Sequence, residues 1–357
     1  MHIAGTNGTI QRPMQNREHI MQQEIRFATF NVCNLAPPGM PFYGDRLPYS
    51  AEQYDAKANW IARQLDELDA DVIGFQEIFS QAALRDVLSR TQNYREAHQL
   101  GIDPLPHAGG LTPSVALVSR LPVTGEAVLH ANLPRGLSVA LPGVPHPADR
   151  FTRPVLQVQL RPEGGTPIDV FVAHLKSKRP DTQAEREDNV YESGMAALRS
   201  LIRRGAEALG LRYLLVAHLQ QHGTPIIVLG DFNDSAGSVP VQIVMGSERY
   251  GADSASERLH DSLRVQSRRH PLRNVGYTHL HDGTHDTVDH ILVSDAFHHA
   301  SPHAVGEVVD VIYRNDHLGW RRPEASDHGI VCMRVRLNMD PKAGMAAGVD
   351  DADSRAP

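Results

Sequence analysis

The chain has 357 residues, 41% hydrophobic and 22% charged, an ordinary composition for a soluble domain with a sizeable core. Lysine and arginine number 35 against 42 aspartates and glutamates, so the net charge is 35 − 42 = −7, which disfavours a protein that coats long nucleic acid through general basicity. No run of about 20 apolar residues can span a bilayer, and two cysteines, Cys33 and Cys332, are too few for a disulfide framework or a thiolate zinc site.

The two ends of the chain differ in composition from its middle. Residues 1–23 are polar and lack the apolar segment of a secretory signal, so we expect a flexible N-terminal segment and a cytoplasmic protein. The tail 339–357 is rich in small and acidic residues and is expected to be disordered. No interior segment has the composition of a linker, and residues 24–338 are therefore expected to form one domain.

Apolar segments of strand length are interleaved with helical segments along this domain. Strands are expected at 24–32, 71–76, 114–123, 153–160, 168–175, 225–230, 287–294 and 329–337. Helices are expected at 51–70 and at 188–221, the second broken near Gly205 and Gly210. Because strands and helices do not alternate regularly, the pattern favours mixed sheets with covering helices over a parallel doubly wound fold.

Two stretches rich in proline and glycine, 34–50 and 129–150, are long for connections inside a compact domain. Such loops often carry function, and we expect them on the substrate side, with plain surface loops as the alternative. Cys33 and Cys332 are expected to be two buried strand thiols, or to form a single bond if the terminal strands are neighbours.

Six of the apolar strands carry polar residues at their ends or in the turns beside them. Buried without partners they would be costly, so we expect them to converge on a metal ion or on one another. These residues are Asn31, Glu77, His174, Asp231, Asn233, Asp289, Asp327 and His328. Carboxylates and amides without thiolates suit Mg²⁺ or Mn²⁺, with Ca²⁺ as a further hard cation. Such a metal polarises a phosphoryl oxygen, and histidines can transfer protons near neutrality.

The segments FNVCNL, FQEI, VAHLKSK, GDFND, VDHILVS and SDH, in this order, resemble the endonuclease/exonuclease/phosphatase (DNase I-like) superfamily. That superfamily includes nucleases, inositol polyphosphate 5-phosphatases and neutral sphingomyelinases. The resemblance covers roughly Ile25 to Leu337, and six motifs in register are far more specific than GDFN or SDH alone. It implies a four-layer α/β sandwich, in which two packed mixed β-sheets are flanked by helices and the site lies at one sheet edge.

The resemblance assigns the catalytic roles among these residues. Asp231 would orient or deprotonate the attacking water, and Asn233 would hold a phosphate oxygen. Asp289 would pair with His328, while His174 would contact the phosphate. Which histidine acts as the general acid stays open.

The resemblance also assigns the metal ligands: Glu77 would be the principal one, with Asn31 beside it, and Asp327 would approach the metal or the water. Read singly, Asp231, Asn233 and Asp327 could instead be turn caps, but turn caps do not explain the joint pattern.

The run HLKSK resembles the bacterial nuclease and sphingomyelinase-like branch more than the abasic-site endonucleases. Lys176 would then contact phosphate, and Lys178 would extend a positive edge. Arg321 directly precedes the SDH loop and would belong to the same edge. Arg153 matches an arginine before the central strand, with a surface ion pair as the equally weighted alternative.

A group of histidines precedes and enters the Asp289 strand, but its spacing fits none of the usual zinc motifs. A solvated loop is therefore the preferred interpretation, and zinc is the minor one. The group comprises His279, His281, His285 and His290.

Three functions are considered. The first is a metal-dependent phosphodiesterase acting on DNA or RNA, suggested by positive residues next to the predicted site. The second is a phosphoesterase for a lipid head group or small phosphodiester, since the apolar stretch 129–145 could touch a membrane or cover a small substrate. The third is a catalytically silent binding protein, ranked last because each expected site position is filled.

Overall fold

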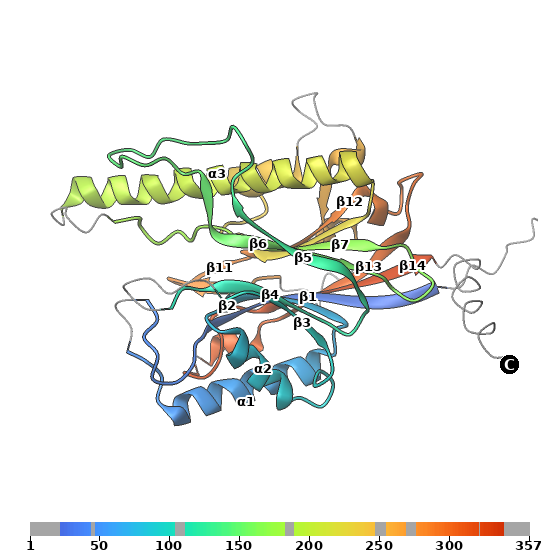
Figure 1. Ribbon diagram of the computed structural model, residues 1–357, viewed down its shortest axis with the longest axis horizontal. Helices are drawn as coiled ribbons and strands as arrows, with labels where there is room; N and C mark the ends of the chain where they lie inside the picture. The colour runs from blue at the N-terminus through green and yellow to red at the C-terminus, as the bar shows by residue number, and fades with distance from the viewer. Residues whose placement is uncertain are drawn as a thin grey trace, which may run out of the picture.

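The computed structural model describes residues 22–43, 47–103, 111–182, 189–246, 255–268, 276–320 and 322–338. In this part of the chain two six-stranded sheets pack face to face, with helices on their outer faces (Figure 1). The predicted four-layer α/β sandwich is confirmed. Gln22 and Gln23 begin the first strand, whereas the rest of the predicted N-terminal segment and the tail 339–357 lie outside the described residues.

The first sheet has the strand order β13-β14-β1-β2-β4-β3 and contains both ends of the described chain. Central strand β1 pairs parallel with β2 and antiparallel with β14. The strands span Gly306–Arg314 (β13), Ile330–Asn338 (β14), Gln22–Leu35 (β1), Val72–Ile78 (β2), Ser114–Ser119 (β4) and His98–Gly101 (β3).

The second sheet has the order β5-β6-β7-β8-β12-β9, and its central pair β7 and β8 is parallel. Its strands span Val123–Asn132 (β5), Arg150–Leu160 (β6), Ile168–His174 (β7), Ile226–Asp231 (β8), Asp289–Ser294 (β12) and Leu259–Asp261 (β9). A short separate hairpin is formed by β10 (His279–His281) and β11 (Thr284–Asp286).

The core between the sheets is built from alternate aliphatic residues of the facing strands, among them Val170, Val172 and Leu229. Gly74 of β2 faces this layer, where a Cβ would lie 2.9 Å from the Cβ of Leu229. A side chain at position 74 would therefore push the sheets apart, which explains the glycine in an otherwise apolar strand.

Helices α1 (Ala51–Leu68) and α2 (Gln81–Ser89) cover the first sheet, and α3 (Val190–His222) covers the second (Figure 1). Two shorter helices, α4 (Val239–Met245) and α5 (Ser262–Val265), complete the set in the described residues. Ser50 and Gln53 form a capping box at the start of α1, and Asn189 caps α3. No described helix is both long enough and apolar enough to cross a membrane.

The predicted break in the second helix is wrong, because α3 continues without interruption through Gly205 and Gly210. A Cβ on Gly210 would lie 2.6 Å from Cδ2 of Leu133, so glycine lets the helix pack closely on the β5–β6 connection. Glycine costs a helix only about 1 kcal/mol relative to alanine, and tertiary packing outweighs that cost.

The predicted long loop 129–150 is shorter than expected, because β5 continues to Asn132 and β6 begins at Arg150. Leu133, Leu141 and Ala148 of the connection are buried in the cluster beneath α3. The apolar residues that suggested membrane contact therefore belong to the core.

The two cysteines are free thiols, Cys332 buried and Cys33 partly buried. Strands β1 and β14 are neighbours, as the alternative required, but Cys332 stands opposite Ala28 rather than Cys33. The bond between the two cysteines is therefore not formed.

Candidate active site

Strand register brings three of the predicted residues side by side at one end of the second sheet. Asp231 ends β8, and His174 is its ladder partner on the parallel strand β7. Asp289 begins β12 and is the ladder partner of Asp231 on the other side. Because ladder partners lie about 5 Å apart, a histidine and a carboxylate must flank Asp231. The clustering of these side chains thus follows directly from the pairing of three strands.

Asp231 lies at the centre of the cluster and is almost fully buried. Its Oδ2 accepts a hydrogen bond from Nδ2 of Asn31 at 3.0 Å and lies 3.3 Å from Nε2 of His174. Its Oδ1 accepts from the backbone N–H of Asn233 at 2.8 Å. Burial and the nearby charge of Asp289 raise the pKa of Asp231 to about 7, against the opposing effect of His328.

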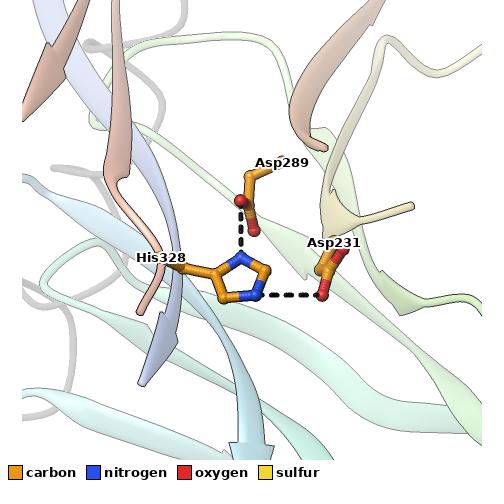
Figure 2. Close-up of side chains that lie close together, drawn as sticks. All are labelled: Asp231, Asp289 and His328. Atoms are coloured by element: carbon orange, nitrogen blue, oxygen red, sulfur yellow. Dashed lines mark hydrogen bonds and ion pairs between the residues drawn. The ribbon is translucent and has the colours of Figure 1, made fainter. Parts of the chain in front are cut away.

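His328 approaches the cluster from the segment just before strand β14 of the first sheet and pairs with Asp289 (Figure 2). Its Nδ1 lies 2.8 Å from Oδ2 of Asp289, and its Nε2 lies 4.0 Å from Oδ2 of Asp231. Burial disfavours the charged ring, but Asp289 and Asp231 outweigh burial and hold the pKa of His328 well above its usual value. His328 is therefore an imidazolium held between two carboxylates.

His174 is the electrostatic opposite of His328, although both are buried histidines. Burial, together with the charges of Arg153 and His328, holds the pKa of His174 well below its usual value. Its Nδ1 is buried without a hydrogen-bond partner among the described residues. His174 is thus a neutral ring whose Nε2 faces Asp231.

Glu77 reaches the cluster through a distortion of β2. Its backbone has φ +63°, and the register of β2 shifts between Gln76 and Ile78. A left-handed glutamate is uncommon and costs about 1 kcal/mol, a strain typical of functional sites. The distortion brings Oε1 of Glu77 to 3.4 Å from Nδ2 of Asn31. Asn31 therefore links Glu77 to Asp231.

Asp327 and Asn233 lie at the edge of the cluster. The side chain of Asp327 interacts with the thiol of Cys33, on the strand that carries Asn31. Asn233 also has a left-handed backbone, with φ +54°, and its Nδ2 donates to the carbonyl oxygen of Leu175 at 3.0 Å. Each of the eight residues predicted to converge thus lies in or beside this cluster.

The donor set fits a hard dication. Potential ligand atoms of Asp231, Asp289 and His328 all lie within 4.8 Å of one another, and of these the two carboxylates can bind a dication while the His328 ring is charged. Oδ1 of Asp289 is buried and has no hydrogen-bond partner among the described residues. With Glu77 and Asn31 adding further oxygens, a dication would compensate carboxylates that otherwise repel one another. The chemistry of the donors is that of Mg²⁺ or Mn²⁺ rather than of a thiolate-bound metal.

Arg153 is buried in the structure, so the surface ion-pair alternative is wrong. Its guanidinium donates from Nη1 to the carbonyl oxygen of Leu175 at 3.3 Å, while Nε has no partner among the described residues. A buried guanidinium with an unused donor, close enough to His174 to lower its pKa, is suited to bind an anion.

The predicted lysine contacts are placed differently. Nζ of Lys176 donates to the carbonyl oxygens of Arg179 at 2.8 Å and Ser177 at 3.2 Å, so this ammonium closes its own loop rather than facing the carboxylates. Burial and the charge of Arg153 lower the pKa of Lys176 to about 8. Lys178 is half exposed, with Nζ 3.8 Å from Oδ1 of Asp234. Arg321 lies outside the described residues.

The histidine group before Asp289 does not form a zinc site. His281 is largely exposed, and His285 packs against Tyr277. Nε2 of His290 lies 2.8 Å from the carbonyl oxygen of Asp234. His279 forms an isolated bridge with His328, and their rings lie 5.0 Å apart. Sequence reasoning placed His279 in a solvated loop and missed this contact, which only the β10–β11 hairpin creates.

A second residue missed from the sequence is Glu207 of α3, which is fully buried. Its carboxylate accepts from the backbone N–H groups of Thr152 at 2.8 Å and Lys176 at 2.7 Å. These two residues flank Arg153 on β6 and His174 at the end of β7. Glu207 therefore holds the two segments that carry the site's arginine and its neutral histidine. Its position on an amphipathic helix gave no signal of that role.

Comparison with known proteins identifies the family and the fold. The sequence pattern of the Endonuclease/Exonuclease/phosphatase family matches residues 28–328. A search among curated proteins found no significant match. Among solved structures, an endonuclease/exonuclease/phosphatase from Bacteroides vulgatus superposes with a TM-score of 0.56 at 16% identity, covering 88% of this chain and 99% of that chain.

Two further structures are similar to the chain at the level of the fold. A mannosyl-6-phosphatase of Bacteroides thetaiotaomicron has a TM-score of 0.51 at 18% identity, covering 87% of this chain and 99% of that chain. The catalytic domain of human nocturnin, with a bound sulfate anion, has a TM-score of 0.53 at 16% identity, covering 87% of this chain and 94% of that chain. The family match extends over most of the chain, and the name of the family supports a phosphoesterase. The chain belongs to the endonuclease/exonuclease/phosphatase family.

Proposed function

We propose that the protein is a divalent-metal-dependent phosphodiesterase that hydrolyses nucleic acid by in-line attack of water on phosphorus. The observation that carries the proposal is the position of Asp231, whose Oδ2 lies 3.3 Å from a neutral histidine and 4.0 Å from a cationic one. A carboxylate between a ring that stays neutral and a ring that stays charged suits proton transfer next to a phosphate anion.

In this proposal Asp231 accepts the proton of the attacking water at Oδ2, the phosphorus–oxygen bond opposite the water breaks, and the leaving oxygen takes up a proton from the charged His328 ring or from water. Asp289 holds Nδ1 of His328, so that Nε2 points toward the reaction centre and its positive charge stabilises the charge that develops on the phosphoryl oxygens. Arg153 offers its unused Nε donor to the same anion. A dication held by Glu77 and Asn31, with Asp327 nearby, would supply Lewis-acid polarisation of a phosphoryl oxygen.

A cavity of about 370 Å³ between α1 and the β13–β14 connection supports nucleic acid as the substrate. The chain has two tryptophans, and both line it: Trp60 at its base and Trp320, 74% exposed, at its rim. His317 connects the cavity to the site, because its Nε2 lies 2.8 Å from the carbonyl oxygen of His328. The exposed indole ring of Trp320 can stack on a base of any sequence, and Arg322 in the same lining can meet a backbone phosphate.

The experiment compares supercoiled plasmid, single-stranded DNA, RNA and sphingomyelin vesicles as substrates, each with Mg²⁺ or Mn²⁺ and with EDTA. We expect metal-dependent cleavage of at least one nucleic acid and no release of phosphocholine. The His328→Ala protein, purified identically, serves as the control for contaminating nucleases and should be inactive. Release of phosphocholine while the nucleic acids stay intact would contradict the substrate assignment and would favour a lipid phosphoesterase instead.

A further inference from the structure

One threonine at the base of the β10–β11 hairpin contacts both segments that carry the Asp289–His328 pair. Thr278 directly precedes β10 and is fully buried. Asp289 is the first residue of β12 in the second sheet, whereas His328 lies just before β14 of the first sheet. The hydrogen bond between these two side chains (Figure 2) therefore joins different sheets, and its length depends on what holds the two segments at a fixed distance.

The side chain of Thr278 holds the start of β12. Its Oγ1 accepts hydrogen bonds from the backbone N–H groups of Val288 at 3.0 Å and of Asp289 at 3.1 Å. The neighbouring strand β9 pairs with β12 along Leu292–Ser294 and does not reach Asp289. At this end of β12 the threonine hydroxyl therefore supplies the acceptor that buried backbone donors require.

The backbone of Thr278 holds the segment that carries His328. Its carbonyl oxygen accepts a hydrogen bond from the N–H group of Gly329 at 2.7 Å. The backbones approach closely at this point, because a Cβ on Gly329 would lie 3.4 Å from Cα of Thr278 and 3.2 Å from the carbonyl oxygen of Arg314. Glycine at position 329 thus leaves room for the hydrogen bond.

Thr278 is itself fixed by the hairpin and by the β13–β14 connection. Its N–H group donates to the carbonyl oxygen of Asp286 at 2.9 Å, at the end of β11. Nδ2 of Asn315 donates to the carbonyl oxygen of the preceding residue, Tyr277, at 2.9 Å. The hydroxyl and the carbonyl oxygen of one immobile residue therefore set the distance between the two segments.

Ser326 and His317 also hold the backbone of His328, but they connect it to the first sheet. Oγ of Ser326 accepts from the N–H group of His328 at 2.9 Å and donates to the carbonyl oxygen of Asn31 at 2.6 Å. Nε2 of His317, in the β13–β14 connection, lies 2.8 Å from the carbonyl oxygen of His328. The contacts of Thr278 differ because they run to the second sheet.

We propose that Thr278 is a positioning residue that sets the spacing of the Asp289–His328 pair, through its hydroxyl on one side and its carbonyl oxygen on the other. The inference rests on the proposed function of this pair in phosphodiester hydrolysis. Thr278 acts on the phosphate only through these two residues. Nδ1 and Oδ2 of the pair lie 2.8 Å apart, and a misplacement of about 1 Å in such an arrangement can cost about 10²-fold in rate.

The first variant is Thr278→Val. Valine has nearly the shape of threonine but offers no oxygen, so the N–H groups of Val288 and Asp289 lose their acceptor and the start of β12 shifts. We expect kcat for a soluble diester to fall about 10–10²-fold. KM should change less than about threefold, because Arg153 and Glu77 lie on other strands.

Two matched variants separate positioning from a general loss of structure. Thr278→Ser keeps the hydroxyl oxygen and should retain kcat within about threefold. Thr287→Val removes a hydroxyl that donates to the carbonyl oxygen of Gly276 at 2.7 Å, also at the base of the hairpin, and should leave kcat near the wild-type value. Urea unfolding accompanies the kinetics of each variant. Equal kcat in Thr278→Val and Thr287→Val would overturn the proposal.

Gly329→Ala perturbs the same pair from the other side and provides a second test if Thr278→Val does not fold. The added methyl group would lie 3.2 Å from the carbonyl oxygen of Arg314, so the Gly329 segment must move and its hydrogen bond to Thr278 lengthens. We expect the same pattern, a lower kcat with little change in KM. A kcat equal to that of the wild type would contradict the role of the Thr278 carbonyl oxygen.

A measurement without substrate tests the spacing independently of the proposed function. A histidine N–H group bound to a carboxylate gives a proton resonance far downfield of the backbone amides, and the one absent from His328→Ala belongs to this pair. We expect wild type and Thr278→Ser to share this resonance, and Thr278→Val to shift or broaden it. Wild-type protein that cleaves no diester would refute the proposed function, whereas an identical resonance in Thr278→Val would refute the positioning role.

Discussion

Replacing His328 with alanine is expected to lower kcat/KM for phosphodiester hydrolysis about 10²–10⁴-fold. The wild-type ring is an imidazolium bound to Asp289 at 2.8 Å, and it is the positive group nearest to Oδ2 of Asp231 among the ion pairs at the site. Its loss removes the charge that balances both carboxylates and the phosphoryl oxygens. Steady-state kinetics on a soluble diester measures the effect directly.

The control for this variant is His281→Ala, on the hairpin that also carries His279. His281 is 74% exposed in its side chain, so its loss should leave kcat/KM within about twofold. Because His328 is buried, urea unfolding of both variants must accompany the kinetics. A folded His328→Ala protein with wild-type activity would remove His328 from the mechanism.

Changing Glu77 to glutamine is expected to lower activity about 10²-fold and to raise the Mg²⁺ concentration needed for half-maximal rate. Glutamine keeps the size of the side chain, so the amide can still meet Asn31, which lies 3.4 Å from Oε1 in the wild type. It loses the negative charge, however, and a neutral amide is a much weaker ligand for a hard dication. Activity measured across a Mg²⁺ titration separates lost affinity from lost turnover.

Glu163→Gln is the matched control, since Glu163 is exposed on the turn between β6 and β7. It should reproduce the wild-type Mg²⁺ titration. The proposed metal role of Glu77 fails if Glu77→Gln shows the same half-saturating Mg²⁺ and the same maximal rate as Glu163→Gln.

The sequence was sufficient to predict the architecture and the convergence of the site. Polar residues at the ends of neighbouring strands meet at one edge of the sheet. His174, Asp231 and Asp289 lie side by side for that reason, since they are ladder partners. One predicted strand, 114–123, covers all of β4 and only the first residue of β5, because the chain bends at Arg120 and Leu121. Periodicity alone does not locate such a turn between two apolar runs.

What the sequence could not predict depends on contacts between distant segments. The continuity of α3 through Gly210 depends on packing against Leu133, far away in the chain. The sequence predicts that Lys176 contacts phosphate, but in the structure its ammonium donates to the carbonyl oxygen of Arg179. The sequence leaves open whether Arg153 lies in a surface ion pair or at the site, because one face of strand β6 is covered and the other is not. Only the position of α3 decides between the two.

The electrostatic difference between the two histidines is the clearest case. Both lie at the ends of apolar strands, and both are buried, yet burial and Arg153 keep the pKa of His174 low while the carboxylates raise that of His328. The pKa of a buried histidine depends on the balance between desolvation and neighbouring charge, and residue type and motif position do not reveal that balance. That balance is set by which side chains the folded sheets place within a few ångströms.

The most direct test of the proposed chemistry is the hydrolysis of bis-p-nitrophenyl phosphate by the metal-stripped protein before and after addition of Mg²⁺ or Mn²⁺. We predict no rate above buffer for the stripped protein, recovery on adding either metal, and no recovery in the His328→Ala protein. A rate that is the same with and without metal, or absent with every metal, would contradict a metal-dependent phosphodiesterase.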